Sequence, residues 1–388
     1  MKQRLFVTLS LAGLAMATFG ATKPKTAIKS LNKTTIQQPT YTEWHDLQVN
    51  AINRFPLHTN FFTYPADDWV SEKDGKIVSK DILHMNKTES KYFLSLDGTW
   101  KFNWVANADQ RPTDFYKEDL DDSKWKTMNL PGIWEMNGFG DPEYVNVGFG
   151  WRGHFDQQPP AVPTKDNHVG SYRRIIDIPA NWDGKQVVAH FGSVTSNIYL
   201  YVNGKFAGYA EDSKVAAEFD ITPYLKKGKN LIAFQTFRWC DGSWDEDQDF
   251  WRLSGVARES YLFARDAQLH LEDIRVTPDL VNNYKDGVLN ISAKVKGTGK
   301  LNFILFDKEG KQVATATGLA KNGTANITMN VENPHKWNAE TPYLYTLQVS
   351  LSSALKNGNM KSASMTPVKV GFRKIELTGG QILVNGQP

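Results

Sequence analysis

The segment from Arg238 to Arg252 holds the densest group of side chains that could bind a ligand. Its five carboxylates are Asp241, Asp245, Glu246, Asp247 and Asp249, and its three tryptophans are Trp239, Trp244 and Trp251. Carboxylate oxygens hydrogen-bond sugar hydroxyls while aromatic rings cover the apolar face of a sugar. The same oxygens suit hard cations such as Na⁺, Mg²⁺ and Ca²⁺. The alternative is a solvated acidic loop, which has no use for three interleaved tryptophans.

The spacing of these acids depends on the local conformation. If the segment is extended, the alternation of side chains places Asp247 and Asp249 on one face, about 7 Å apart, with Glu246 on the other face. Glu43, Asp46 and Glu211 are carboxylates elsewhere in the chain, and they could join a cation shell only if the fold brings them together.

Other catalytic chemistries have little support in the sequence. The eight histidines lack the H-x-H or H-x-x-x-H spacing of a zinc site. There is neither a G-x-S-x-G elbow nor a phosphate-binding loop. Cys240 is the single cysteine and has no histidine nearby in sequence, so we interpret it as a buried small residue rather than a nucleophile.

Length and charge narrow the class of protein. A chain of 388 residues predicts two or three compact units. The composition, 40% hydrophobic and 22% charged, is globular, and aromatic residues make up 12%. The net charge of +3 is small and the basic residues are dispersed, which excludes a nucleic-acid partner.

The N-terminus is typical of an exported protein. Lys2 and Arg4 precede an apolar stretch from Leu5 to Phe19, which predicts a signal peptide over residues 1–21. A membrane anchor is the alternative, but it needs roughly 20 apolar residues, so we expect no membrane association after cleavage. Residues 22–40 are rich in Lys and Thr and predict a flexible linker. We therefore expect a periplasmic or secreted protein.

The positioning elements beyond residue 41 are short β-strands. Runs of β-branched and aromatic residues punctuated by Gly, Pro, Asn or Asp predict strands at Trp100–Trp104, Ser171–Ile178, Gln186–Phe191, Asn197–Val202 and Asn230–Phe237. Asn203-Gly204 predicts a type I′ hairpin turn. Evenly spaced short strands favour a sandwich, so we expect an all-β jelly roll over residues 41–266.

A second all-β unit is predicted over residues 267–373. Its expected strands are Leu271–Val276, Val288–Val295, Leu301–Phe306, Ala325–Val331, Tyr343–Leu351 and Met365–Val370. About seven strands in roughly 100 residues favour an immunoglobulin-like sandwich. The last residues, Gly380–Pro388, predict one strand and a turn without a return strand.

Motifs in a fixed order resemble glycoside hydrolase family 2, in particular the large bacterial β-galactosidases. The matching segments are Asn53–Arg54, Leu96–Phe102, Leu130–Trp134, Tyr144–Val147, Phe191–Val194, Val202–Gly204, Glu246–Gly255, Glu332–Pro334, Pro342–Tyr345 and Val370–Arg373. The resemblance implies a sugar-binding jelly roll, an immunoglobulin-like domain and then a catalytic TIM barrel, of which residues 374–388 would be the start.

The resemblance also implies roles for individual residues. Asn146 matches a substrate-contacting position, and Asp249 matches one that contacts both the substrate and a sodium ion. A second cation, magnesium or calcium, would be held by Glu43, Asp46, the Val49 backbone, Glu211 and Asp241. Three of these residues, Glu43, Asp46 and Glu211, replace a shorter acid and two amides of the relatives.

The catalytic pair is expected outside this sequence. A retaining glycosidase needs two carboxyl groups about 5–5.5 Å apart, and in this family both are glutamates of the barrel, beyond residue 388. We therefore predict a full-length β-galactosidase that hydrolyses terminal β-D-galactosides with retention, and a chain that is inactive by itself. Its partners would be the β-galactoside and the missing barrel, and the resemblance allows for a homo-oligomer.

Three alternatives stay open. One is a subunit or fragment that complements a separately encoded barrel. Jelly rolls also serve lectins, so a non-catalytic carbohydrate-binding protein of two β domains fits the same pattern. A family 2 hydrolase for another β-glycoside, such as a glucuronide, mannoside or galacturonide, fits as well.

Overall fold

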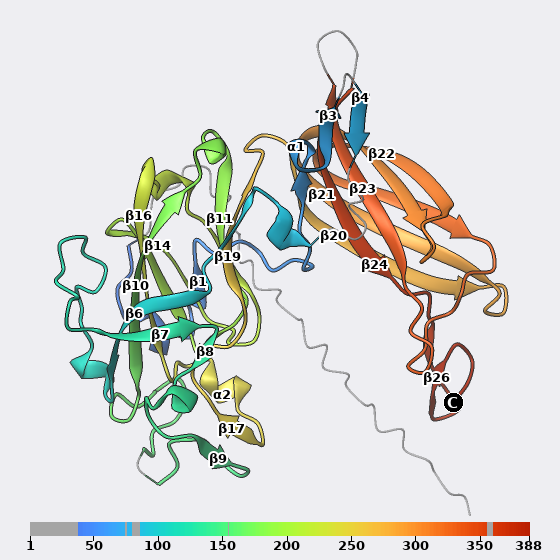
Figure 1. Ribbon diagram of the computed structural model, residues 1–388. Coiled ribbons are helices and arrows are strands. Elements are labelled where there is room, and N and C mark those ends of the chain that lie inside the picture. The colour runs from blue at the N-terminus through green and yellow to red at the C-terminus, as the bar shows by residue number, and fades with distance from the viewer. Residues whose placement is uncertain (1–37, 74–75, 80–85, 154, 355–359) are drawn as a thin grey trace, which may run out of the picture. The chain divides into compact units, whose positions relative to one another are not determined.

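The computed structural model describes residues 38–73, 76–79, 86–153, 155–354 and 360–388 (Figure 1). The expected signal peptide, residues 1–21, and most of the expected linker, residues 22–40, lie outside these ranges. The described chain is almost entirely β-structure. No helix in the described ranges has the length and apolar character needed to cross a membrane.

The first sandwich pairs a large sheet with a smaller one. The strands of the seven-stranded sheet, in spatial order, are β1 (Ala51–Ile52), β14 (Lys205–Ala210), β13 (Ile198–Val202), β16 (Gly228–Phe237), β10 (Val169–Ile178), β6 (Gly98–Val105) and β7 (Lys126–Leu130). Those of the four-stranded sheet are β15 (Ala217–Asp220), β11 (Gln186–Phe191), β19 (Ser260–Arg265) and β5 (Phe93–Ser95).

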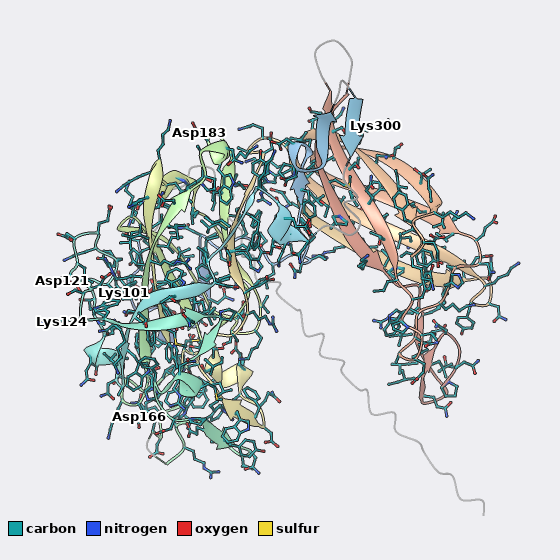
Figure 2. All side chains as sticks on the ribbon, in the orientation of Figure 1. Lys101, Asp121, Lys124, Asp166, Asp183 and Lys300 are labelled. Carbon is teal, nitrogen blue, oxygen red and sulfur yellow. The ribbon has the colours of Figure 1, made fainter. Side chains whose placement is uncertain are left out.

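The central strands of the large sheet are buried on both faces. In β13, Leu200 and Val202 enter one apolar core, whereas Tyr199 and Tyr201 enter a second core on the opposite face. This follows from the alternation of side chains along a strand. Charged side chains such as Asp121, Lys124 and Asp183 lie at the periphery (Figure 2).

The predicted hairpin is confirmed. Strands β13 and β14 pair as antiparallel neighbours. The turn residues Asn203 and Gly204 have φ angles of 49° and 75°, the left-handed region that a type I′ turn requires at both positions.

Short elements cap one end of this sandwich. They are β8 (Gly132–Ile133), β9 (Glu143–Val145), β12 (Val194–Thr195), β17 (Phe250–Arg252), β18 (Gly255–Val256) and the single helical turn α2 (Ser243–Glu246). Figure 1 shows β9, β17 and α2 together at that end.

The second sandwich is built from long strands, as in an immunoglobulin-like domain. These are β20 (His270–Val281), β21 (Asp286–Phe306), β22 (Gln312–Val331), β23 (Tyr345–Ala354) and β24 (Met360–Val370). A short strand from early in the chain, β2 (Tyr64–Pro65), pairs with β24. The range 41–266 predicted for the first unit therefore contains a segment that joins the sheet of the second. Neighbouring short elements are α1 (Ala66–Trp69), β3 (Val70–Lys73) and β4 (Lys76–Ser79).

Strand β21 differs from the prediction of two separate strands. Its first half pairs with β20 and its second half with β23, and the register on β22 shifts between Val295 and Thr298. Gly297 lies at this shift with a φ of 82°, and a Cβ there would stand 2.3 Å from the carbonyl oxygen of Gln268. The Gly-rich segment therefore bends one strand instead of turning the chain.

The C-terminal strand also differs from the prediction. Strand β26 (Gln381–Val384) pairs antiparallel with β25 (Ile375–Thr378) across a turn at Gly379 and Gly380. The predicted strand and the turn after it are both present, since Asn385 and Gly386 form a turn with φ angles of 53° and 78°. The prediction missed the partner of the strand, which is the preceding strand β25 and not a following one. That residues 374–388 begin a barrel stays a prediction.

Candidate functional site

Asn146 and Asp249 lie at the same end of a two-stranded ribbon. In the β9–β17 pair, Val145 stands opposite Phe250 and Tyr144 opposite Trp251. Asn146 directly follows Val145, and Asp249 directly precedes Phe250. The fold thus brings together two residues that are far apart in sequence, and both side chains are exposed. Their roles towards substrate and sodium stay predictions.

Tyr144 links the two strands at this end. Its phenol donates a hydrogen bond of 2.5 Å to Oδ1 of Asp249, and this hydrogen bond raises the pKa of Tyr144. Tyr144 is not among the site residues predicted from the sequence. The sequence signal for it was the spacing, because Tyr144 lies two residues before Asn146 and side chains two residues apart in an extended segment share a face.

The acidic segment before Asp249 is not extended over residues 243–246, so the condition for placing Asp247 beside Asp249 with Glu246 opposite is not met. Residues 243–246 form the α2 turn. Glu246 accepts hydrogen bonds from Ser213, including one of 2.8 Å from its backbone nitrogen. Asp247 forms an ion pair with the buried Arg252. These two acids brace the loop, whereas Asp249 faces solvent.

A small pocket of about 50 Å³ lies behind the ribbon. Trp151, Trp239 and the buried Arg238 contribute to its wall. Arg238 forms a 2.8 Å ion pair with Glu143, the first residue of β9. The pocket wall therefore anchors the ribbon that carries Asn146 and Asp249.

A second cluster contains Glu211, Cys240 and Asp241. One potential ligand atom from each lies within 4.8 Å of the others, and all three residues are buried. The N-terminal segment fixes them, because Glu211 donates its backbone N–H to Asn50 and Asp241 donates to Trp44, at 3.0 and 2.9 Å. Two of the predicted cation ligands, Glu211 and Asp241, are thus brought together.

The electrostatics of this cluster favour a cation. Burial, reinforced by the neighbouring Asp241, raises the pKa of Glu211 to about 8. Burial also raises the pKa of Asp241. Oδ2 of Asp241 has no hydrogen-bond partner among the described residues, although a buried carboxylate oxygen normally has one. Clustered carboxylate oxygens are the donors that Mg²⁺ and Ca²⁺ prefer, so the residues present fit such an ion.

Glu43 and Asp46 lie outside this close group. Glu43 accepts a hydrogen bond of 3.1 Å from the Tyr199 phenol and one of 2.6 Å from the backbone of Thr40. Asp46 accepts from the backbone of Gln48 at 3.0 Å, and its charge contributes to the raised pKa of Asp241. The Val49 backbone is near in the same loop, where its N–H bonds the Asp46 carbonyl at 2.9 Å.

Cys240 is fully buried, as the sequence analysis predicted. Burial raises the pKa of its thiol well above the ordinary value. A buried thiol of raised pKa is a poor nucleophile, since the thiolate is the reactive form.

The chain matches two family models in sequence. Residues 93–266 match the sugar-binding domain of glycosyl hydrolases family 2, and residues 269–373 match a second domain model of the same family. Asn146, Glu211, Asp241 and Asp249 lie within the first range.

Named relatives are β-galactosidases. The chain is 36% identical over 360 residues to the β-galactosidase of Priestia megaterium and 36% identical over 346 residues to that of Halalkalibacterium halodurans. These alignments cover 89% and 88% of this chain but 33% and 32% of the relatives. The β-galactosidase large subunit of Leuconostoc lactis is 32% identical, and 53% of it is covered. The chain thus spans about a third of the length of the first two relatives.

Solved structures share the fold at lower identity. A β-glucuronidase of Bifidobacterium dentium superposes with a TM-score of 0.61 at 19% identity, covering 76% of this chain and 51% of that one. A β-glycosidase from Bacteroides vulgatus gives 0.58 at 23% identity, covering 76% and 36%. At these identities the likeness concerns the fold alone.

Proposed function

Because this chain belongs to glycosyl hydrolase family 2, we propose that it supplies the substrate-orienting domains of a β-galactosidase that hydrolyses terminal β-D-galactosides with retention. The observation that carries the proposal is the convergence of Asn146 and Asp249 at one exposed end of the β9–β17 ribbon, inside the sugar-binding domain. The relatives of 32–36% identity named above, all called β-galactosidases, support the choice of sugar.

The proposed roles follow from the chemistry of these side chains. The Asn146 amide can both donate to and accept from sugar hydroxyls, and the Asp249 carboxylate accepts two hydrogen bonds per oxygen. Asp249 would also give one ligand to a sodium ion. Tyr144 holds Oδ1 of Asp249, which fixes the carboxylate for substrate. The residues orient the sugar and do not cleave it.

The catalytic carboxyl pair would come from elsewhere in the full-length protein. A retaining glycosidase needs an acid/base and a nucleophile about 5–5.5 Å apart beside the glycosidic bond. Glu211 and Asp241 lie close together, but both are buried, so a glycoside cannot reach them. We propose that they instead hold magnesium or calcium and brace the N-terminal segment. We also propose that the full-length enzyme works in the periplasm or outside the cell.

The first test is the release of nitrophenol from nitrophenyl β-D-galactopyranoside. We expect no turnover by the 388-residue chain and turnover by the full-length protein encoded by the gene. Matched nitrophenyl β-D-glucuronide and β-D-mannoside should be much poorer substrates. A glucuronide or mannoside that exceeds the galactoside in kcat/KM would overturn the choice of sugar.

A second test addresses Asp249. In the full-length enzyme, Asp249→Asn should lower kcat/KM for the galactoside by about 10-fold or more, since a charge-assisted hydrogen bond contributes roughly 1.5–3 kcal/mol. The matched control is Asp245→Asn, an exposed acid of the same segment. Equal kinetics of the two variants would contradict the role of Asp249.

A further inference from the structure

The β9–β17 ribbon has one face that carries two exposed aromatic rings. Tyr144 and Trp251 stand opposite each other and are 52% and 54% exposed, with ring centroids 5.6 Å apart. Val145 and Phe250 point to the other face, as alternation requires, and are partly buried. Contiguous exposed apolar surface rimmed by polar residues is typical of a ligand-binding or interaction site, whereas single exposed apolar residues are ordinary.

The polar pair lies at the end of the ribbon, beside the aromatic pair. Asn146 follows Tyr144 by two residues and Asp249 precedes Trp251 by two residues, each just beyond the end of its strand. The hydrogen bond from the Tyr144 phenol to Oδ1 of Asp249 shows that the carboxylate lies beside the aromatic pair. An apolar patch beside hydrogen-bonding groups is the pattern that a saccharide fits, because each sugar unit has apolar C–H faces and hydroxyls at its edge.

The ribbon is held rigidly from beneath. Arg252 is buried, donates to the Val145 carbonyl at 3.1 Å and to the Phe250 carbonyl, and forms the ion pair with Asp247. Its guanidinium lies 4.8 Å from the centre of the Phe250 ring. A preorganised surface loses little conformational entropy when a ligand binds.

We propose that Tyr144 and Trp251 form a stacking platform for a second sugar ring, the unit linked to the galactosyl residue that Asn146 and Asp249 hold. This inference rests on the proposed function. The ligand class is therefore a β-linked disaccharide or longer glycan, and Trp251 determines the preference for such a ligand over a galactoside with a small aglycone.

Affinity for matched ligands tests the platform. Titration calorimetry on the 388-residue chain would compare lactose with methyl β-D-galactopyranoside. A ring stacked on an aromatic side chain contributes about 0.5–1.5 kcal/mol, so lactose should bind about 2- to 13-fold more tightly. Trp251→Leu keeps an apolar side chain but loses the flat ring, and it should reduce that ratio to about 1 without changing the affinity for the methyl galactoside.

Two further variants separate the parts of the site. Tyr144→Phe keeps the ring and loses the hydrogen bond to Asp249, so it should lower the affinity for lactose and for the methyl galactoside by a similar factor. Ile175→Ala, at a residue that is 65% exposed elsewhere on the first sandwich, should change neither. If Trp251→Leu lowers the affinity for both ligands equally, or changes neither affinity, the proposal of a stacking platform is overturned.

The same comparison can be made with other sugars and with the full-length enzyme. Suppose that cellobiose binds more tightly than methyl β-D-glucopyranoside, that this difference depends on Trp251, and that the galactosides do not bind. The stacking platform would then be supported and the proposed galactoside substrate would be overturned. If no ligand binds the 388-residue chain, kcat/KM of the full-length enzyme for lactose and for methyl β-D-galactopyranoside decides. An unchanged ratio in Trp251→Leu would mean that the rest of the protein covers the ring, and the platform would be overturned.

Discussion

Glu218 accepts hydrogen bonds from two histidines inside the first sandwich. His190 bonds one carboxylate oxygen and His58 the other, both at 2.8 Å. Burial acts to raise the pKa of Glu218, but the two hydrogen bonds outweigh it and hold the pKa at about 2. The hydrogen bond to Glu218 raises the pKa of His58 in turn, against the effect of burial.

These shifts predict the pH range of greatest stability. The contribution of Glu218 to folding stability is present above pH 4.5, the ordinary pKa of a glutamate, and is lost as the pH falls towards 2. The contribution of His58 to folding stability is present below pH 6.5, the ordinary pKa of a histidine, and is lost as the pH rises through the raised pKa of His58. We expect the wild-type Tm to fall between pH 6 and pH 9 by more than that of His58→Gln, in thermal melts followed by circular dichroism. Parallel pH curves for the two proteins would refute this pairing.

The cation cluster predicts opposite effects with and without metal. Glu211→Gln removes one of two adjacent buried carboxylates, so the metal-free protein should be as stable as wild type or more stable. In the wild-type protein, Mg²⁺ or Ca²⁺ at a concentration of 100 times its Kd should raise the unfolding free energy by about 2.7 kcal/mol and raise the Tm accordingly. Glu211→Gln should lose this rise. Differential scanning fluorimetry with and without each ion measures both effects. Asp245→Asn, an exposed acid, should keep the full rise, and a rise retained by Glu211→Gln would exclude this residue as a ligand.

Sequence reasoning found residues of the site but not their neighbours in space. Asn146, Asp249, Glu211 and Asp241 were named from the resemblance, and the fold places them in two groups. The hydrogen bond between Tyr144 and Asp249 depends on the register of a ribbon whose strands are about a hundred residues apart in sequence. Local pattern carries no information on such a pairing.

At the scale of elements, the turn between β13 and β14 is fixed by its side chain as well as its backbone. The Asn203 amide donates to the Tyr224 carbonyl and to Asn230, both at 2.8 Å, and its oxygen accepts from the backbone of Leu231 at 2.9 Å. Asn203 is buried, so these bonds satisfy groups that water does not reach.

Substitutions at the two residues of this turn should lower the free energy of unfolding by different amounts. Asn203→Ala leaves buried partners unsatisfied, at about 1–3 kcal/mol for each group, so we expect a loss of at least about 3 kcal/mol. Gly204→Ala places a Cβ in ordinary van der Waals contact, 3.9 Å from Cγ of Glu118 and from the Tyr116 carbonyl oxygen, at a left-handed φ of 75°, which costs only about 1–2 kcal/mol. Urea denaturation would give both free energies of unfolding. A larger loss for Gly204→Ala would mean that backbone conformation, and not the buried network, fixes the turn.

The elements that the sequence predicted best are those defined by local pattern. Gln186–Phe191 has the same bounds in prediction and structure, because an apolar run between turn residues describes a buried strand. Strand β21 was divided in two because Gly297 and Gly299 are typical of a turn. Tertiary pairing on both sides of the bend carries the strand through this segment.

At the scale of the whole molecule, the two sandwiches have separate apolar cores. Phe234 is fully buried in the core between the sheets of the first sandwich, and Phe303 is fully buried in the core of the second. The two cores share no residue among those described. Each core resembles that of an independent domain, which typically unfolds as one cooperative unit.

This separation predicts two calorimetric transitions. Phe234→Ala and Phe303→Ala should each cost about 3–5 kcal/mol, because each removes a buried aromatic ring and leaves a cavity. Differential scanning calorimetry should show that each variant lowers the temperature of a different transition and leaves the other in place. A single transition lowered equally by both variants would mean that the sandwiches unfold together. Since β2 joins the second sheet from a point between β1 and β5, such coupling would be transmitted through the segment on either side of Tyr64.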